Sequence, residues 1–287
     1  MPSTKELRAR IRSVSNTSKV TGAMQLIAAS KMRKAQDQVM QGKKYSQTLY
    51  KLLMNLSSSV DEEKENIPLL ENRVIKNKLM ILITPERGLA GALVGNINKK
   101  ALEVIKSSNE KYTILSVGKK GYRFLNSRGH DIVEQLIIPD RPELSDTIKI
   151  SEIAIKGFLD KKWDQVDLLY SEFFNTTSQV PKSQVILPIL TPDSTNSIES
   201  KDYIYEPSAY DVLKDITPKY VRAQIFQSIL ESFASEHSAR MVAMQNATDN
   251  ANELIGDLTL DLNKARQETI TAELLDLIGG IAALEGK

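Results

Sequence analysis

Residues 216–275 read ITPKYVRAQIFQSILESFASEHSARMVAMQNATDNANELIGDLTLDLNKARQETITAELL, and no proline follows Pro218. Small or apolar residues recur in this stretch at every seventh position, interrupted once by a histidine. The series comprises Ile216, Ala223, Leu230, His237, Met244, Ala251, Leu258, Ala265 and Ala272. A heptad sustained over this length is typical of a helix that packs along another helix. We therefore expect residues 208–287 to form a C-terminal coiled-coil helix.

The first 58 residues carry a matching pattern, with no proline between Pro2 and Pro68. Ser3 or Thr4 can cap the start of a helix. The expected contact line is Leu7, Ile11, Val14, Ser18, Thr21, Gln25, Ala28, Met32, Ala35 and Val39. After Gly42 this contact line continues with Tyr45, Leu49, Leu52, Leu53 and Leu56. A second apolar line beside it comprises Val20, Met24 and Ile27. The short side chains of the contact line between Ser18 and Gln25 would let two helices approach closely. Residues 1–58 are thus expected to form an N-terminal coiled-coil helix.

Charge indicates that these two helices pair with each other. Residues 1–44 hold ten basic and two acidic side chains, whereas residues 210–287 hold seven basic and twelve acidic ones. Opposite net charges favour pairing between the tracts over pairing of each tract with itself. Because a folded middle section separates the tracts and both leave it toward the same side, we expect an antiparallel pair.

Residues 74–205 alternate between strand and helix patterns. Strands are expected at 78–84, 112–117, 132–138, 165–173 and 183–190, and helices at 93–108, 119–129 and 144–162. Such alternation is typical of an α/β domain with a mostly parallel sheet and flanking helices. The predicted fold class is a Rossmann-like central domain plus a long antiparallel two-helix coiled coil formed by the chain ends.

Composition excludes several classes of function. The 287 residues are 41% hydrophobic and 26% charged, with a net charge of +2 and no cysteine. Disulfides and thiol chemistry are therefore excluded, and no apolar run is long enough for direct membrane insertion. His130 and His237 lack a second ligand at metal spacing. We find no catalytic constellation and expect no metal and no cofactor.

Two alternative functions remain at this point. Gly88, Gly91 and Gly95 lie between a strand and a helix, where nucleotide-binding loops place glycines, although their spacing fits neither common nucleotide motif. A free-standing nucleotide-binding α/β protein would use this turn. A basic coiled-coil scaffold that binds nucleic acid would use the cations Lys5, Arg8, Arg10, Arg12, Lys19, Lys31, Arg33 and Lys34. A solvated face, or one facing an acidic protein, explains these cations better, because no aromatic residue precedes Tyr45.

Three long stretches resemble one family, the gamma subunit of the F-type ATP synthase. They are RIRSVSNTSKVTGAMQLIAASKMRKAQ (10–36), ITPERGLAGALVGNIN (83–98) and ASEHSARMVAMQNATDNANELIGDLTLDLNKARQETITAELLDLIGGIAAL (234–284). The resemblance covers essentially the whole chain. It implies a non-catalytic rotor of the proton-transporting ATPase, whose stiff and asymmetric shaft couples proton flow to ATP synthesis or hydrolysis.

The resemblance also implies the partners and the location. One copy would rotate inside the hexamer of alpha and beta subunits, bind the epsilon subunit and the membrane c-ring, and belong to a complex that also contains the delta subunit. No nucleic acid would be bound. The complex would lie on the cytoplasmic face of a bacterial plasma membrane, to which this subunit would attach peripherally.

Individual contact residues follow from the same resemblance. Met24 stands where the family has a methionine near the lever loop of beta, and Arg266 with Gln267 stands where a pair hydrogen-bonds a catch loop of beta. Tyr203, Tyr205 and Glu206 match the foot that touches the membrane ring. The apolar C-terminal tip would run in a sleeve at the top of the hexamer.

Two positions depart from the family pattern. Gly22 replaces a common lysine, which weakens the local helix propensity by ~1 kcal/mol. Ala90 stands where many members have cysteine, so thiol switching is excluded here.

Overall fold

The computed structural model describes residues 3–59, 67–190 and 205–285. Its elements are α1 (Thr4–Ser59), β1 (Asn77–Ile83), α2 (Leu93–Ser107), β2 (Lys111–Val117), α3 (Lys119–Asn126), β3 (Ile132–Leu136), the 3₁₀ turn η2 (Leu144–Thr147), α4 (Ile148–Leu159), β4 (Gln165–Phe173), β5 (Gln179–Leu187) and α5 (Ala209–Glu285). The chain forms two compact units. The larger is residues 28–240, and the smaller combines residues 1–27 with 241–287.

The larger unit is built on a five-stranded sheet with the order β3-β2-β1-β4-β5. The first four strands in this order are parallel, and β5 is antiparallel to β4. This arrangement confirms the predicted α/β class. The last strand was predicted at 183–190 but spans Gln179–Leu187. The sequence pattern misled because Pro181 resembles a loop residue, whereas an edge strand tolerates proline.

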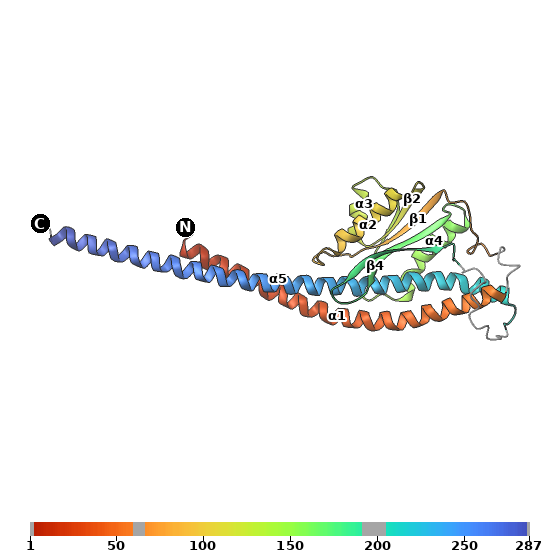
Figure 1. Cartoon of the computed structure of the whole chain (residues 1–287), viewed down its shortest axis with the longest axis horizontal. Helices are drawn as coiled ribbons and strands as arrows, with labels where there is room; N and C mark the ends of the chain where they lie inside the picture. The colour runs from red at the N-terminus through yellow and green to blue at the C-terminus, as the bar shows by residue number, and fades with distance from the viewer. Residues whose placement is uncertain (1–2, 60–66, 191–204, 286–287) are drawn as a thin grey trace. The chain divides into compact units, whose positions relative to one another are not determined.

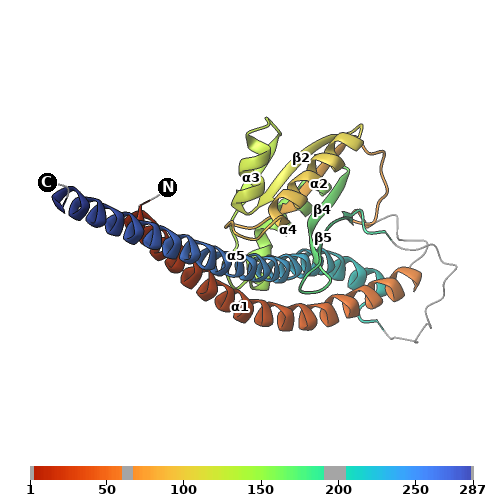
Figure 2. The same cartoon turned by 60° about the vertical axis from the view of Figure 1, so that its left-hand side comes forward.

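Helices cover both faces of this sheet (Figures 1 and 2). On one face, α2 and α3 pack on a core that includes Met80, Leu82 and Leu169. On the other face, α4 and the portions of α1 and α5 that belong to the larger unit pack on alternate residues of the same strands. Leu53 of α1 and Ile225 of α5 are completely buried there. The two long helices thus supply one layer of the domain.

Serine side chains cap both long helices. The Ser3 hydroxyl accepts the Glu6 backbone N–H at 3.3 Å, and the Glu6 carboxylate accepts the Ser3 N–H at 3.0 Å. This reciprocal capping box confirms the predicted cap at Ser3. At the start of α5, the Ser208 hydroxyl accepts the Asp211 N–H at 3.1 Å.

In the described ranges, none of the helices has the length and apolar character needed to cross a membrane.

We predict that Gly157→Ala destabilises the larger unit. A Cβ at Gly157 would lie 2.0 Å from Cζ2 of Trp163, whose buried indole N–H donates to the Ala154 carbonyl at 3.1 Å. Displacing the indole should lower the free energy of unfolding by about 2 to 3 kcal/mol in urea titrations. Gly95→Ala is the matched control, because a Cβ there would meet no described atom within 4 Å apart from its chain neighbours and the backbone of its own helix. It should stabilise helix α2 by about 0.5 to 1 kcal/mol, and equal losses in both variants would contradict this packing argument.

Candidate functional site on the two long helices

The predicted heptad is the buried contact line of α5 in both units. Buried positions in the larger unit are Ala223, Leu230 and His237, and those in the smaller unit are Met244, Ala251 and Leu258. On α1, every predicted line residue from Leu7 to Val39 is buried or half-buried. We call these facing residues of α1 and α5 the seam.

The seam of the larger unit departs from the predicted pattern at one point. Tyr45 was expected in the contact line but is 50% exposed, and the neighbouring Ser46 is buried instead. The Gln224 amide of α5 donates to the Ser46 hydroxyl at 3.0 Å. This hydrogen bond offsets the cost of removing the Ser46 hydroxyl from water, which explains why a polar residue occupies the contact position.

The seam of the smaller unit is held by small polar side chains. Ser18 of α1 donates to the Asn252 side chain at 2.8 Å, and the hydroxyls of Thr21 and Thr248 lie 2.7 Å apart. A Cβ at Gly22 would lie 3.9 Å from the Thr248 methyl group, so Gly22 faces the same contact. The short side chains expected between Ser18 and Gln25 therefore meet α5 directly, and the pairing is antiparallel. Thr248 and Asn252 were not predicted as contact residues. The one feature of the sequence that could have indicated them is the polar run that follows Met244.

The C-terminal part of α5 exposes apolar side chains. Ala265 of the heptad is half-buried, Ala272 is exposed, and Arg266 and Gln267 are exposed. Large apolar side chains with more than two-fifths of their surface exposed are Leu254, Leu260, Ile270, Leu274, Leu275, Leu277, Ile278 and Ile281. Such a concentration is typical of a surface that contacts another protein.

The exposed face of α1 combines apolar and basic residues. Val20 and Ile27, predicted beside the seam, are each 58% exposed, while Met24 is half-buried. In the described residues, none of the ion pairs joins α1 to α5; Lys31 instead pairs with Asp140 of the loop after β3 at 2.6 Å. The charge difference between the helices is therefore not used in direct pairing, and the other candidate cations of α1 remain exposed.

The predicted foot residues lie around the start of α5. Tyr205 is half-buried and packs against the main core of the larger unit, while Glu206 is exposed. Tyr203 lies outside the described residues. The surroundings of Tyr205 and Glu206 are therefore described, and the proposed contact of all three residues with a partner stays a prediction.

The glycine turn after β1 makes contacts within the larger unit. The Gly88 carbonyl accepts a hydrogen bond from Arg240 of α5 at 3.2 Å. Thr84 donates to the Val117 carbonyl at 3.2 Å and accepts the Gly121 N–H at 2.9 Å. Leu89 and Gly91 have positive φ angles of 61° and 55°, as a tight turn requires. These contacts favour a packing role over phosphate binding.

The two histidines occupy different environments. His237 is a buried seam residue, and burial, reinforced by the nearby cations Arg240 and Lys31, lowers its pKa to about 4. His130 is half-buried and follows Gly129, whose φ is 75°. Among the described residues, no group of three His, Cys, Asp or Glu side chains could hold a metal ion. His237 therefore packs as a neutral ring at neutral pH.

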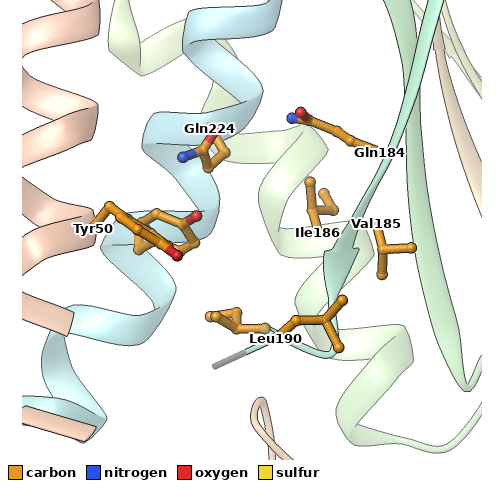
Figure 3. Close-up of a pocket in the computed structure, with 8 residues that line it drawn as sticks. Tyr50, Gln184, Val185, Ile186, Leu190 and Gln224 are labelled. Atoms are coloured by element: carbon orange, nitrogen blue, oxygen red, sulfur yellow. The ribbon is translucent and has the colours of Figure 1, made fainter. Parts of the chain in front are cut away.

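A cavity of about 300 Å³ lies between α1, α5 and β5 (Figure 3). Tyr50 and Tyr220 stand at its wall with ring centroids 6.1 Å apart, near the amides of Gln184 and Gln224. Burial raises the pKa of the Tyr220 phenol to about 12, so this group stays protonated at neutral pH. Phenols and amides can both donate and accept hydrogen bonds at this cavity.

Relatives identify the family to which this arrangement belongs. A family model described as ATP synthase matches residues 3–284. The chain is 42% identical to the ATP synthase gamma chain of Roseiflexus sp. (strain RS-1) over 288 residues, which is 99% of both chains. It belongs to the ATP synthase gamma chain family. The gamma chain of Dehalococcoides mccartyi (strain CBDB1) is 43% identical over 279 residues, covering 97% of this chain and 98% of that one.

Solved structures share the fold of this gamma-family chain. The rotor of Euglena gracilis mitochondrial ATP synthase in rotational state 1 matches with a TM-score of 0.66 and 19% identity, covering 93% of this chain and 98% of that one. The central stalk and c-ring structure from Tetrahymena thermophila mitochondrial ATP synthase contains a chain that matches with a TM-score of 0.60 and 24% identity. That match covers 79% of this chain and 99% of that one.

We predict that His237 makes folding stability depend on pH. Its folded pKa of about 4 lies below the usual value of 6.5, so the unfolded chain binds a proton that the folded chain rejects. Protonation of His237 in the unfolded chain should therefore lower the free energy of unfolding by up to about 3 kcal/mol as the pH falls from about 6.5 to about 4. Urea titrations across this range should show a smaller loss for His237→Gln than for the unaltered chain. Burial raises the pKa of Glu236 and has the opposite effect, so the difference between variants isolates His237.

The control for this pH dependence is His130→Gln, which keeps the buried ring of His237. Its profile should follow that of the unaltered chain. If His237→Gln and the unaltered chain lose stability in parallel, His237 does not cause the dependence.

We also predict direct coupling between Thr21 and Thr248. Their hydroxyls form a hydrogen bond across the seam, so Thr21→Val and Thr248→Val should be less costly together than the sum of the single changes. A double-mutant cycle on unfolding should give an interaction energy of about 0.5 to 1.5 kcal/mol. The exposed Thr17, paired in the same cycle with Thr248, provides the control and should give additive effects.

Proposed function

We propose that this chain is the central rotor shaft of an F-type ATP synthase, coupling proton flow through a membrane ring to ATP synthesis or hydrolysis in an alpha/beta hexamer. The observation that carries the proposal is the seam: both chain ends form one antiparallel helix pair in a chain of the gamma family. A helix pair stabilised by continuous side-chain burial resists separation under load. The likeness of the fold to chains in a rotor and in a central stalk of mitochondrial ATP synthases supports this role.

The chain itself is proposed to be a non-catalytic part of the ATPase. Its conspicuous polar groups serve packing: Arg240 and Thr84 bond to the backbone, and His237 is buried in the seam. The chemistry of ATP would then belong to the other subunits, and this chain would change their conformations by rotating. A shaft with two different helices presents different faces to the three catalytic subunits and can act on them one at a time.

The partners follow from this role. The alpha and beta subunits would surround the helix pair, the c-ring and epsilon subunit would bind the sheet-containing unit, and the delta subunit would join the same complex. The exposed basic face of α1 suits an acidic partner surface. With one copy per complex, the chain would attach peripherally at the cytoplasmic face of a bacterial plasma membrane.

Specific contacts are proposed at the exposed positions. Met24 would meet a lever loop of beta, and Arg266 with Gln267 would hydrogen-bond a catch loop of beta. Both side chains of the latter pair are exposed and so available to a partner. Tyr203, Tyr205 and Glu206 would form the foot on the membrane ring.

Assembly with alpha and beta subunits tests the proposed function. The chain should copurify with them as one copy per complex and rotate during ATP hydrolysis when a bead is attached to the sheet-containing unit. An isolated chain that hydrolyses ATP, or a complex that hydrolyses ATP without rotation of this chain, would contradict the proposal.

We predict that Arg266→Ala/Gln267→Ala weakens coupling without weakening the fold. The exposed side chains make little contact within the chain, so its thermal unfolding should stay within about 2 °C of the unaltered value. Loss of charged hydrogen bonds to a partner costs about 1.5 to 3 kcal/mol, which should lower ATP synthesis by an order of magnitude or more. Lys264→Ala, an exposed cation on the same helix, is the matched control and should keep most activity.

A further inference from the structure

Helix α5 forms a row of hydrogen bonds with the end of strand β4. The Ser232 hydroxyl accepts the Ser171 N–H at 3.4 Å, and Ser235 donates to the Ser171 carbonyl at 3.0 Å. One turn further, Ser238 donates to the Thr176 carbonyl in the hairpin after β4 at 2.7 Å. These contacts lie within the larger unit and fix α5 at the carboxyl end of β4.

Arg240 extends this attachment to the loop after β1. Its Nη2 atom donates to the Gly88 carbonyl at 3.2 Å and to Glu236 at 2.6 Å, and its Nη1 atom lies 3.4 Å from Nδ1 of His237. The side chains of Arg240 and Glu236 are each only 12% exposed. A desolvated ion pair that also bonds to the backbone has a more restricted geometry than an exposed pair.

The location of these bonds is distinctive. In the strand order β3-β2-β1-β4-β5, the connections diverge between β1 and β4. Open parallel sheets usually bind their ligands in the crevice outside the carboxyl ends of these two central strands. Ser238 bonds to the loop after β4 and Arg240 to the loop after β1, so α5 joins the two loops that border this crevice.

We propose that residues 238–240 of α5 act as an internal ligand at this crevice, and that Arg240 is the positioning residue through which twisting load passes between α5 and the sheet. This inference rests on the proposed rotor function. Hydrophobic packing alone lets a helix slide or roll, because it has little directionality. Hydrogen bonds to two separate loops oppose both movements.

The test uses the complete complex in sealed vesicles, with variants Arg240→Met and Arg240→Lys. ATP hydrolysis and vesicle acidification are measured together, and amide hydrogen exchange is measured in residues 84–92. Arg240→Met should raise exchange in this loop by about tenfold or more, because a charged hydrogen-bond donor is lost. Acidification per ATP should fall while hydrolysis continues, and Arg240→Lys should restore part of it.

Two further variants separate load transfer from folding. Arg240→Met leaves Glu236 buried without its cation, so Glu236→Gln/Arg240→Met removes both charges and should show the same loss of coupling. Gly157→Ala weakens the same unit away from the crevice and should keep acidification per ATP. Unchanged coupling in a folded Arg240→Met complex, or equal losses with Gly157→Ala, would overturn the inference. Absence of coupled acidification in the unaltered complex would instead overturn the proposed function.

Discussion

Mutual burial of α1 and α5 is the constraint on which the rest of the structure depends. A single long helix in water gains little from its own hydrogen bonds and must bury an apolar stripe to persist. Here the two helices approach each other closely in both units, at Gly42 and Leu230 in the larger one and at Gly22 and Thr248 in the smaller one. The two terminal helices must therefore pair. The residues between them must then form a domain in which the chain leaves α1 and returns to α5 on the same side.

The sheet imposes a second requirement. Parallel strands such as β1 and β4 are apolar on both faces, so both faces need cover. Two short helices, α2 and α3, cover one face, but the other is covered by α4 together with the long helices. Part of the proposed shaft is thus also part of the domain core. Separating the helix pair from the sheet would expose this core, which makes the two structurally inseparable within the larger unit.

Periodic features were predictable from sequence, whereas individual polar contacts were not. The heptad through Leu230 and Leu258 indicates a helix that packs along another helix. The apolar segments of β1 to β4, each separated from the next by a helix pattern, indicate strands of a parallel sheet. Ser46 replaced Tyr45 at the seam because a hydrogen bond from Gln224 offset the burial of a hydroxyl, and no single-helix pattern contains that information. The same holds for Arg240, whose backbone partner lies 152 residues away in the chain. Contact residues for other subunits came from family resemblance and remain predictions.

The contacts of α5 change in kind along the helix. Next to the sheet, hydrogen bonds to backbone atoms fix the helix in one orientation. In the smaller unit, Thr248 and Asn252 pair with α1 through short polar side chains, which specify register more than they add stability. Beyond Ala265 the large apolar side chains of the described residues are 45% to 65% exposed. Each large side chain would gain about 1.5 to 3 kcal/mol from full burial, so a surrounding partner can stabilise these turns without any specific bond. Nonspecific apolar contact resists rotation less than directed hydrogen bonds do. Helix α5 therefore combines a directed attachment beside the sheet with exposed apolar turns at its C-terminal end, and the second feature would suit a rotating contact in the proposed rotor.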